Sequence, residues 1–179
     1  MAENVFIIKF EEESKSYQTF SELKQMHATK QIVGEQMGVI LNDADAGIQI
    51  KDFLDFTGTD KTARGSIIGA LVGIIGGPLG ILLGWMGGTF IGATGDAREI
   101  KHAMNVFEQV TSFIAHGQTG VILLAREEDF ETIQNYAYNL GGQVVRLNGD
   151  YVRDQIKQAQ LAQFELERDA RKRWKDRNK

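Results

Sequence analysis

The chain has 179 residues, with 20 Lys and Arg against 24 Asp and Glu, no cysteine and a single proline. This length fits one domain with appendages. Without cysteine, the chain can form neither a disulfide scaffold nor a thiolate metal site nor a thiol nucleophile. The histidines His27, His102 and His116 lie far apart in sequence, so no helical turn presents a pair of metal ligands. We therefore expect no enzymatic activity, no cofactor and no metal.

The first third of the chain predicts a strand, a helix and a hairpin. Residues 5–10 are apolar and rich in β-branched and aromatic side chains, which is typical of a buried strand. A helix is expected over residues 17–33, ended by Gly34, and strands are expected at 36–41 and 48–53. The acidic residues between and after these strands do not match a calcium loop, because Gly47 and Leu54 would occupy ligand positions. They indicate a hairpin turn instead.

A glycine-rich segment follows, over residues 65–95. It holds eleven of the 20 glycines and no charged side chain. Glycines recur at every fourth position in two series, and such positions stack on one face of a helix, where they allow close packing. The residues expected to serve helix packing and oligomerisation are Gly65, Gly69, Gly73, Gly77, Gly80, Gly84, Gly88 and Gly92.

The length of this segment favours a helical hairpin over one straight helix. A single helix would extend about 46 Å, longer than the ~30 Å hydrocarbon core of a bilayer, and Gly76-Gly77-Pro78 would break it near the middle. Basic residues flank the segment on both sides, which favours both ends on the cytoplasmic face. We expect a glycine-zipper hairpin over residues 61–95 that re-enters or thinly spans the membrane. The alternative is a hairpin buried between the subunits of a soluble oligomer.

The second half of the chain repeats the order of the first. A helix is expected over residues 97–115, a strand at 121–125, a helix at 127–140 and a strand at 143–147. Two βαβ units fold most simply into a four-stranded antiparallel sheet with helices on one face. We therefore predict an α+β, ferredoxin-like domain formed by residues 1–60 and 96–148, with a charged helical tail over residues 149–179.

The tail differs in charge from the rest of the chain. A long solvated helix is expected over residues 151–173, and residues 168–179 carry seven basic and two acidic side chains, a local charge of +5. The remaining chain has a net charge of −9, which disfavours nucleic acid as a partner. An anionic leaflet attracts each nearby basic residue with a free energy of about 1 kcal/mol. An ordinary solubilising terminus is the equal alternative. The residues expected at a membrane interface are Trp85, Arg171, Lys172, Arg173 and Trp174.

The order of elements resembles a known family. The glycine run over residues 65–80 lies between a strand–helix–hairpin unit and a closing strand–helix–strand unit, in which Gly141-Gly142 precedes the last strand. In this the chain resembles the bacterial domain of unknown function 1269, over about residues 5–147. The resemblance implies a membrane-associated bacterial protein and supplies no reaction or catalytic residues. The charged tail lies outside it.

These observations predict a non-enzymatic protein that self-assembles through the glycine-zipper hairpin on or in a bilayer. Its partners would be further copies of itself and the lipid bilayer, including anionic lipids. The start of the chain has no basic region before its short apolar run, so we expect no signal peptide and a cytoplasmic location for the polar parts. The alternative is a soluble homo-oligomeric module that binds a small ligand.

Overall fold

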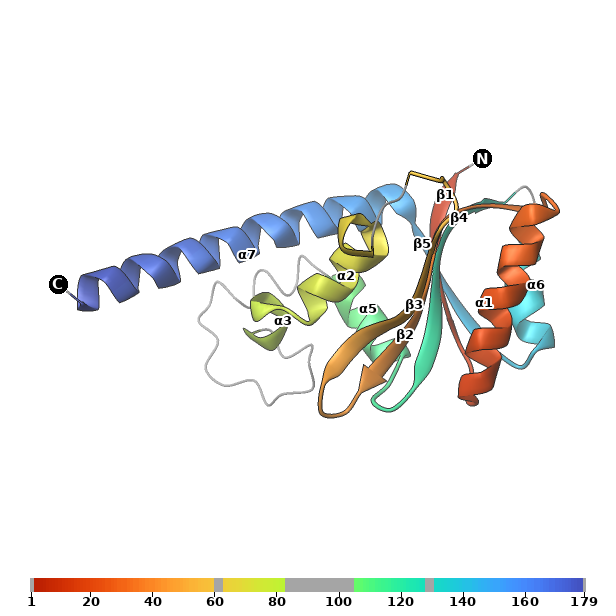
Figure 1. Ribbon diagram of the computed structural model, residues 1–179, viewed down its shortest axis with the longest axis horizontal. Helices are drawn as coiled ribbons and strands as arrows, with labels where there is room; N and C mark the ends of the chain where they lie inside the picture. The colour runs from red at the N-terminus through yellow and green to blue at the C-terminus, as the bar shows by residue number, and fades with distance from the viewer. Residues whose placement is uncertain (1, 60–62, 83–104, 128–130, 179) are drawn as a thin grey trace.

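The computed structural model describes residues 2–59, 63–82, 105–127 and 131–178. In these ranges the protein has an α+β fold, in which an antiparallel sheet carries helices on both faces (Figure 1). The described elements are, in chain order, β1 (Glu3–Lys9), α1 (Glu13–Ala28), β2 (Ile32–Asp43), β3 (Gly47–Asp55), the 3-10 turn η1 (Ala63–Gly65), α2 (Ile67–Ile75), α3 (Pro78–Leu82), α5 (Asn105–Phe113), β4 (Thr119–Glu127), α6 (Thr132–Asn139), β5 (Gln143–Asn148) and α7 (Gly149–Arg177).

The sheet has five strands in the order β3-β2-β4-β1-β5. All five strands predicted from the sequence are present, but the expected four-stranded sheet is wrong, because the β2–β3 hairpin adds β3 as an edge strand. In the middle of the sheet, the apolar strand β4 is buried almost throughout, as its lack of polar interruption predicted.

The two faces of the sheet belong to two separate hydrophobic cores. Alternate residues of β1 point to opposite faces, so Val5 and Ile7 enter one core while Phe6 and Ile8 enter the other. Helices α1 and α6 cover the second of these faces, and α2, α3, α5 and the first half of α7 cover the first. The expectation that helices would cover only one face is therefore wrong.

Two helix boundaries also differ from those predicted. Helix α1 ends at Ala28 rather than near Gly34, and Val33 lies in β2, because Lys30 adopts a left-handed conformation that turns the chain into the strand. The predicted helix start at Glu127 is the end of β4. The buried Glu127 carboxylate still serves α6, since it accepts a hydrogen bond from the backbone N–H of Ile133 at 3.3 Å and pairs with Arg146 at 3.2 Å.

Candidate interaction surface

The described part of the glycine-rich segment, residues 65–82, forms α2 and α3, which lie on either side of the predicted break. Ser66 begins α2, because its hydroxyl accepts a hydrogen bond from the Gly69 N–H at 2.8 Å and donates one to the Ala63 carbonyl at 2.6 Å. The Ile67 N–H donates to the Gln36 side chain at 2.9 Å, which ties the helix start to β2. The break predicted at Gly76-Gly77-Pro78 is confirmed, since α2 ends at Ile75 and α3 begins at Pro78.

The apolar face of α2 and α3 is covered by the protein itself. Its side chains lie in the core between the sheet and α7, with no exposed area at Ile68, Leu71, Ile75 or Leu79. The sequence predicted that lipid or a second copy must cover such a segment. For the described part of the segment that inference is wrong, because its apolar side chains are buried against the second face of the sheet, which is itself apolar.

The described glycines of the glycine-rich segment have two different environments. A methyl group added at Gly69 would overlap the Ala63 carbonyl, and one at Gly80 would overlap the Ile75 carbonyl. One added at Gly77 would lie 2.7 Å from the Gly73 carbonyl oxygen. These three glycines therefore allow close approach within the chain. Gly65 and Gly73 are exposed, and a methyl group on either would meet no described atom within 4 Å.

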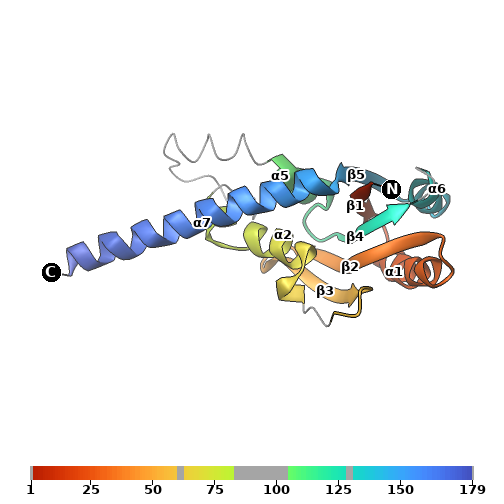
Figure 2. The ribbon, with the colours of Figure 1, turned by 90° about the horizontal axis from the view of Figure 1, so that it is seen from above.

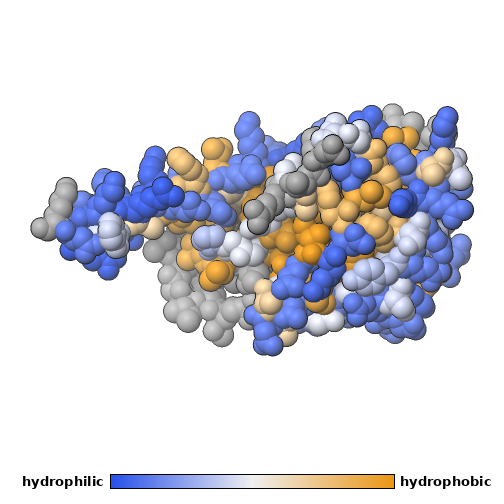
Figure 3. Space-filling model, viewed as in Figure 1, coloured by the Kyte–Doolittle hydropathy of each residue, from blue (hydrophilic) through white to orange (hydrophobic). Residues whose placement is uncertain are grey.

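Gly73 lies in a groove between α2 and α7. The groove has a volume of about 440 Å³. Small residues of α2, Gly69, Ala70 and Gly73, line one side, and Gln163 and Phe164 belong to the opposite wall. Figure 3 shows hydrophobic surface in the middle of this face, where α2 meets the sheet. A glycine without a Cβ in an open groove is the kind of surface on which a second helix packs closely.

The first half of α7 is fixed to the sheet. The Asn148 side chain caps it by accepting a hydrogen bond from the Tyr151 N–H at 3.0 Å. Val152, Gln155, Ile156 and Ala159 are buried against the sheet, so the expectation of a solvated helix is wrong for this half. After Gly149, neither proline nor glycine occurs in α7, so the sequence does not mark this difference along the helix.

A network of charges adds to this attachment. Arg153 of α7 pairs with Glu3 of β1, and Arg126 of β4 lies 2.7 Å from Glu35 of β2 and 3.8 Å from Glu3. The two arginine side chains are nearly half exposed, whereas the Glu3 side chain is 12% exposed. The network joins three strands and α7 at the end of the sheet where α7 begins.

The second half of α7 extends away from the body in both ribbon views (Figures 1 and 2). Every residue from Arg168 to Asn178 is exposed. Arg171, Lys172, Arg173 and Trp174, which the sequence assigned to a membrane interface, all lie in this free part. The side chain of Trp174 is two-thirds exposed.

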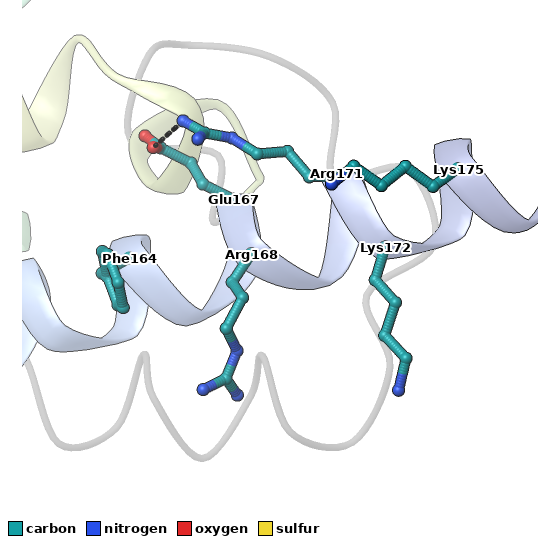
Figure 4. Close-up of a pocket in the computed structure, with 6 residues that line it drawn as sticks. All are labelled: Phe164, Glu167, Arg168, Arg171, Lys172 and Lys175. Atoms are coloured by element: carbon teal, nitrogen blue, oxygen red, sulfur yellow. Dashed lines mark ion pairs between the residues drawn. The ribbon is translucent and has the colours of Figure 1, made fainter.

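One side of the free half carries a stripe of basic side chains, which we call the basic stripe. The basic stripe consists of Arg168, Arg171, Lys172 and Lys175. Figure 4 shows these four residues together with their neighbours Phe164 and Glu167. Two carboxylates lie close to it: Glu167 is 3.8 Å from the Arg171 guanidinium one turn away, and Asp169 is 3.8 Å from the Nε of Arg168. The stripe therefore keeps a net positive charge. The sequence placed all four basic residues in the positive segment 168–179 and assigned Arg171 and Lys172 to a membrane interface. It did not single out Phe164, which a search for residues three and four apart would have found.

The remaining predicted positions lie outside the described residues. These are Gly84, Trp85, Gly88 and Gly92. In the described ranges, no helix is both long and apolar enough to cross a membrane. The same ranges contain no group of three or more His, Asp or Glu side chains placed to hold a metal ion.

The pKa shifts of the described residues have structural causes away from this surface. The pKa of Asp43 is lowered by hydrogen bonds from the backbone N–H groups of Ala46 and Asp45, which confirms the hairpin turn predicted there. A hydrogen bond from the Gln18 amide lowers the pKa of Glu22. Burial raises the pKa of Tyr136. None of these groups forms a catalytic pair with a second shifted group on the basic stripe or in the groove.

The comparisons with known proteins give no family for this chain. No family model, no curated protein and no solved structure matches it. The resemblance to the domain of unknown function 1269 stays a prediction.

Proposed function

We propose that the protein is a non-enzymatic, membrane-associated protein that self-assembles, and that the free half of α7 attracts it to anionic lipid. The observation that carries the proposal is this free half, which is exposed on all sides and strongly basic at the end of a chain that is otherwise acidic. A helix with no tertiary contacts of its own is marginally stable in water, so a binding surface would stabilise it.

Self-assembly is proposed through the glycine face of α2. Not all of the expected packing glycines are available for this role. Gly69, Gly77 and Gly80 already serve contacts within the chain. Gly73 is exposed in the groove beside α7 and is free for a contact between copies. It is therefore the described glycine on which we place the assembly role.

We also propose that the sheet is a ferredoxin-like arrangement with one added edge strand. The inner order β5-β1-β4-β2 is that expected of two βαβ units whose strands interleave, and β3 extends it at the β2 edge. In this proposal the segment from β3 to α5 is an insertion that supplies the second layer of helices.

Flotation with vesicles tests the membrane proposal. The full chain is expected to float with vesicles of phosphatidylglycerol and phosphatidylcholine and to stay behind with phosphatidylcholine alone. Replacing Arg171, Lys172 and Arg173 by Gln removes about 3 kcal/mol of attraction, which corresponds to about 100-fold weaker binding at low salt. Failure of the unchanged chain to float with anionic vesicles would refute the proposal.

A matched control removes the same charge from the body. Lys24, Lys51 and Lys157 are exposed and lie away from the free half of α7. Their joint replacement by Gln lowers the net charge equally. We expect the control to float as the unchanged chain does, and an equal loss in both variants would mean that only net charge matters.

A second candidate function is a soluble homo-oligomeric module that binds a small ligand. The burial of the α2 face by the chain itself favours it, because protein rather than lipid covers these apolar residues. A monodisperse oligomer in buffer without detergent, together with no flotation, would support this candidate over the first.

A further inference from the structure

Large hydrophobic side chains are exposed unevenly over the molecule. In the described ranges there are four on the end formed by α3 and the outer part of α7, which are Ile81, Leu161, Phe164 and Trp174. Each is between 59% and 66% exposed. Away from this end, only Tyr138 of α6 is exposed to a similar degree among the described residues, at 60%. Among the described residues, exposed large apolar side chains therefore concentrate at the end formed by α3 and the outer part of α7.

The same end carries the basic stripe. Phe164, Arg168, Arg171 and Lys175 follow one another at spacings of four, three and four residues, which places them along one side of the helix (Figure 4). Helix α3, which bears Ile81, packs against α7. Exposed apolar residues and basic residues thus occur on the adjoining helices α3 and α7. Ile81, Leu161 and Phe164 lie near the body, and Trp174 lies among the basic residues of the outer part of α7.

The charges at the start of α7 have a different character. They are paired within the chain, as in the contacts of Arg126 with Glu35 and of Arg153 with Glu3. Pairing of this kind leaves less charge for an external partner. Among the described residues, the end formed by α3 and the free half of α7 combines a net positive charge with several large exposed apolar side chains.

We propose that this end, which we call the α3–α7 end, contacts an anionic lipid bilayer directly. This inference rests on the proposed membrane association and adds which surface meets the lipid. Arg168, Arg171, Lys172 and Lys175 bind lipid phosphates, while the side chains of Ile81 and Phe164 enter the headgroup region. The combination fits a bilayer interface, where aromatic residues and basic residues are favoured together. A second copy that bound through its own basic stripe would fit less well, because two basic stripes would repel each other.

The absence of cysteine allows a direct test with single labels. Ile81→Cys, Phe164→Cys and, as the matched control, Tyr138→Cys are each labelled with an environment-sensitive fluorophore in the full chain. All three positions are exposed, so the changes leave the cores intact. On vesicles of phosphatidylglycerol and phosphatidylcholine, we expect a blue shift of emission at Ile81→Cys and Phe164→Cys and no shift at Tyr138→Cys.

The outcomes separate this inference from the proposed function. If the labelled proteins float with the vesicles but only the Tyr138→Cys label shifts, or no label shifts, the inference is overturned and membrane association stands. If none floats, membrane association falls as well. Blue shifts at Ile81→Cys and Phe164→Cys that grow with protein concentration without vesicles would assign this end to a second copy and overturn the inference.

Discussion

The two glycines Gly69 and Gly73 lie one turn apart on α2, and we predict that Ala substitutions at them change stability in opposite directions. At Gly73 the new methyl group meets no described atom within 4 Å, so the gain in helix propensity, about 1 kcal/mol, is kept. At Gly69 the methyl group would overlap the Ala63 carbonyl. Relieving this overlap moves η1 and disturbs the Ser66 cap, for a net loss of about 1–3 kcal/mol.

Thermal unfolding of the two variants at one protein concentration measures this difference. In a chain of this size, a change of 1 kcal/mol moves the midpoint of thermal unfolding by about 2–4 °C, so Gly73→Ala should unfold above the unchanged chain and Gly69→Ala below it. The comparison is internal, because both changes add the same methyl group to the same helix. A destabilised Gly73→Ala would mean that this face is already packed in the folded protein, and the reasoning about an open groove would be refuted.

Three further results are expected. The bulky change Gly73→Leu should reduce chemically crosslinked oligomers while leaving the fold intact by circular dichroism, and unchanged crosslinking would remove Gly73 from the assembly surface. The change Glu3→Gln should lower the free energy of unfolding by about 1–2 kcal/mol in urea, because the charge network that includes Arg153 loses its best-buried member; no change would mean that α7 is held by apolar contacts alone. The folded pKa of Glu22 lies below its ordinary value of 4.5, so its small contribution to stability is present above that value and is lost as the pH falls through the folded pKa. Gln18→Ala should raise the pKa of Glu22 in an NMR titration, and an unshifted titration would exclude the amide as the cause.

Periodicity predicted the elements of this fold better than their ends. Strong local patterns, such as the apolar runs of β1 and β4, located all five strands. The end of α1 was placed too late, because Gly34 resembles a helix stop although it lies within β2. At the start of α6, Glu127 resembles an acidic first turn, whereas it is a buried strand residue whose carboxylate reaches the helix from outside.

The second layer of helices could not be predicted from local patterns. An apolar, glycine-rich stretch without charges reads the same whether lipid, another subunit or a sheet face covers it. The face that covers Leu71 and Leu79 forms only when strands far apart in sequence pair, such as β2 with β4, which are separated by the whole insertion. The burial of α7 at Val152 and Ile156 depends on the same face.

The basic character of the candidate surface was visible in the sequence, but its shape was not. Composition located the positive charge near the end of the chain. That α7 leaves the body at Arg168 follows only from how the helix packs on the sheet and on α2 and α3. The contribution of Ile81 required the contact of α3 with α7, which joins segments far apart in sequence.

Hydrogen–deuterium exchange of the full chain, with and without phosphatidylglycerol vesicles, tests the central claim most directly. Amides in residues 168–177 lie in the exposed part of α7, where few tertiary contacts slow their exchange in buffer. The account predicts that anionic vesicles slow exchange in this segment and leave the first half of α7, around Val152 and Ile156, unchanged. Equal exchange of residues 168–177 with and without vesicles, under conditions where the protein floats, would contradict it.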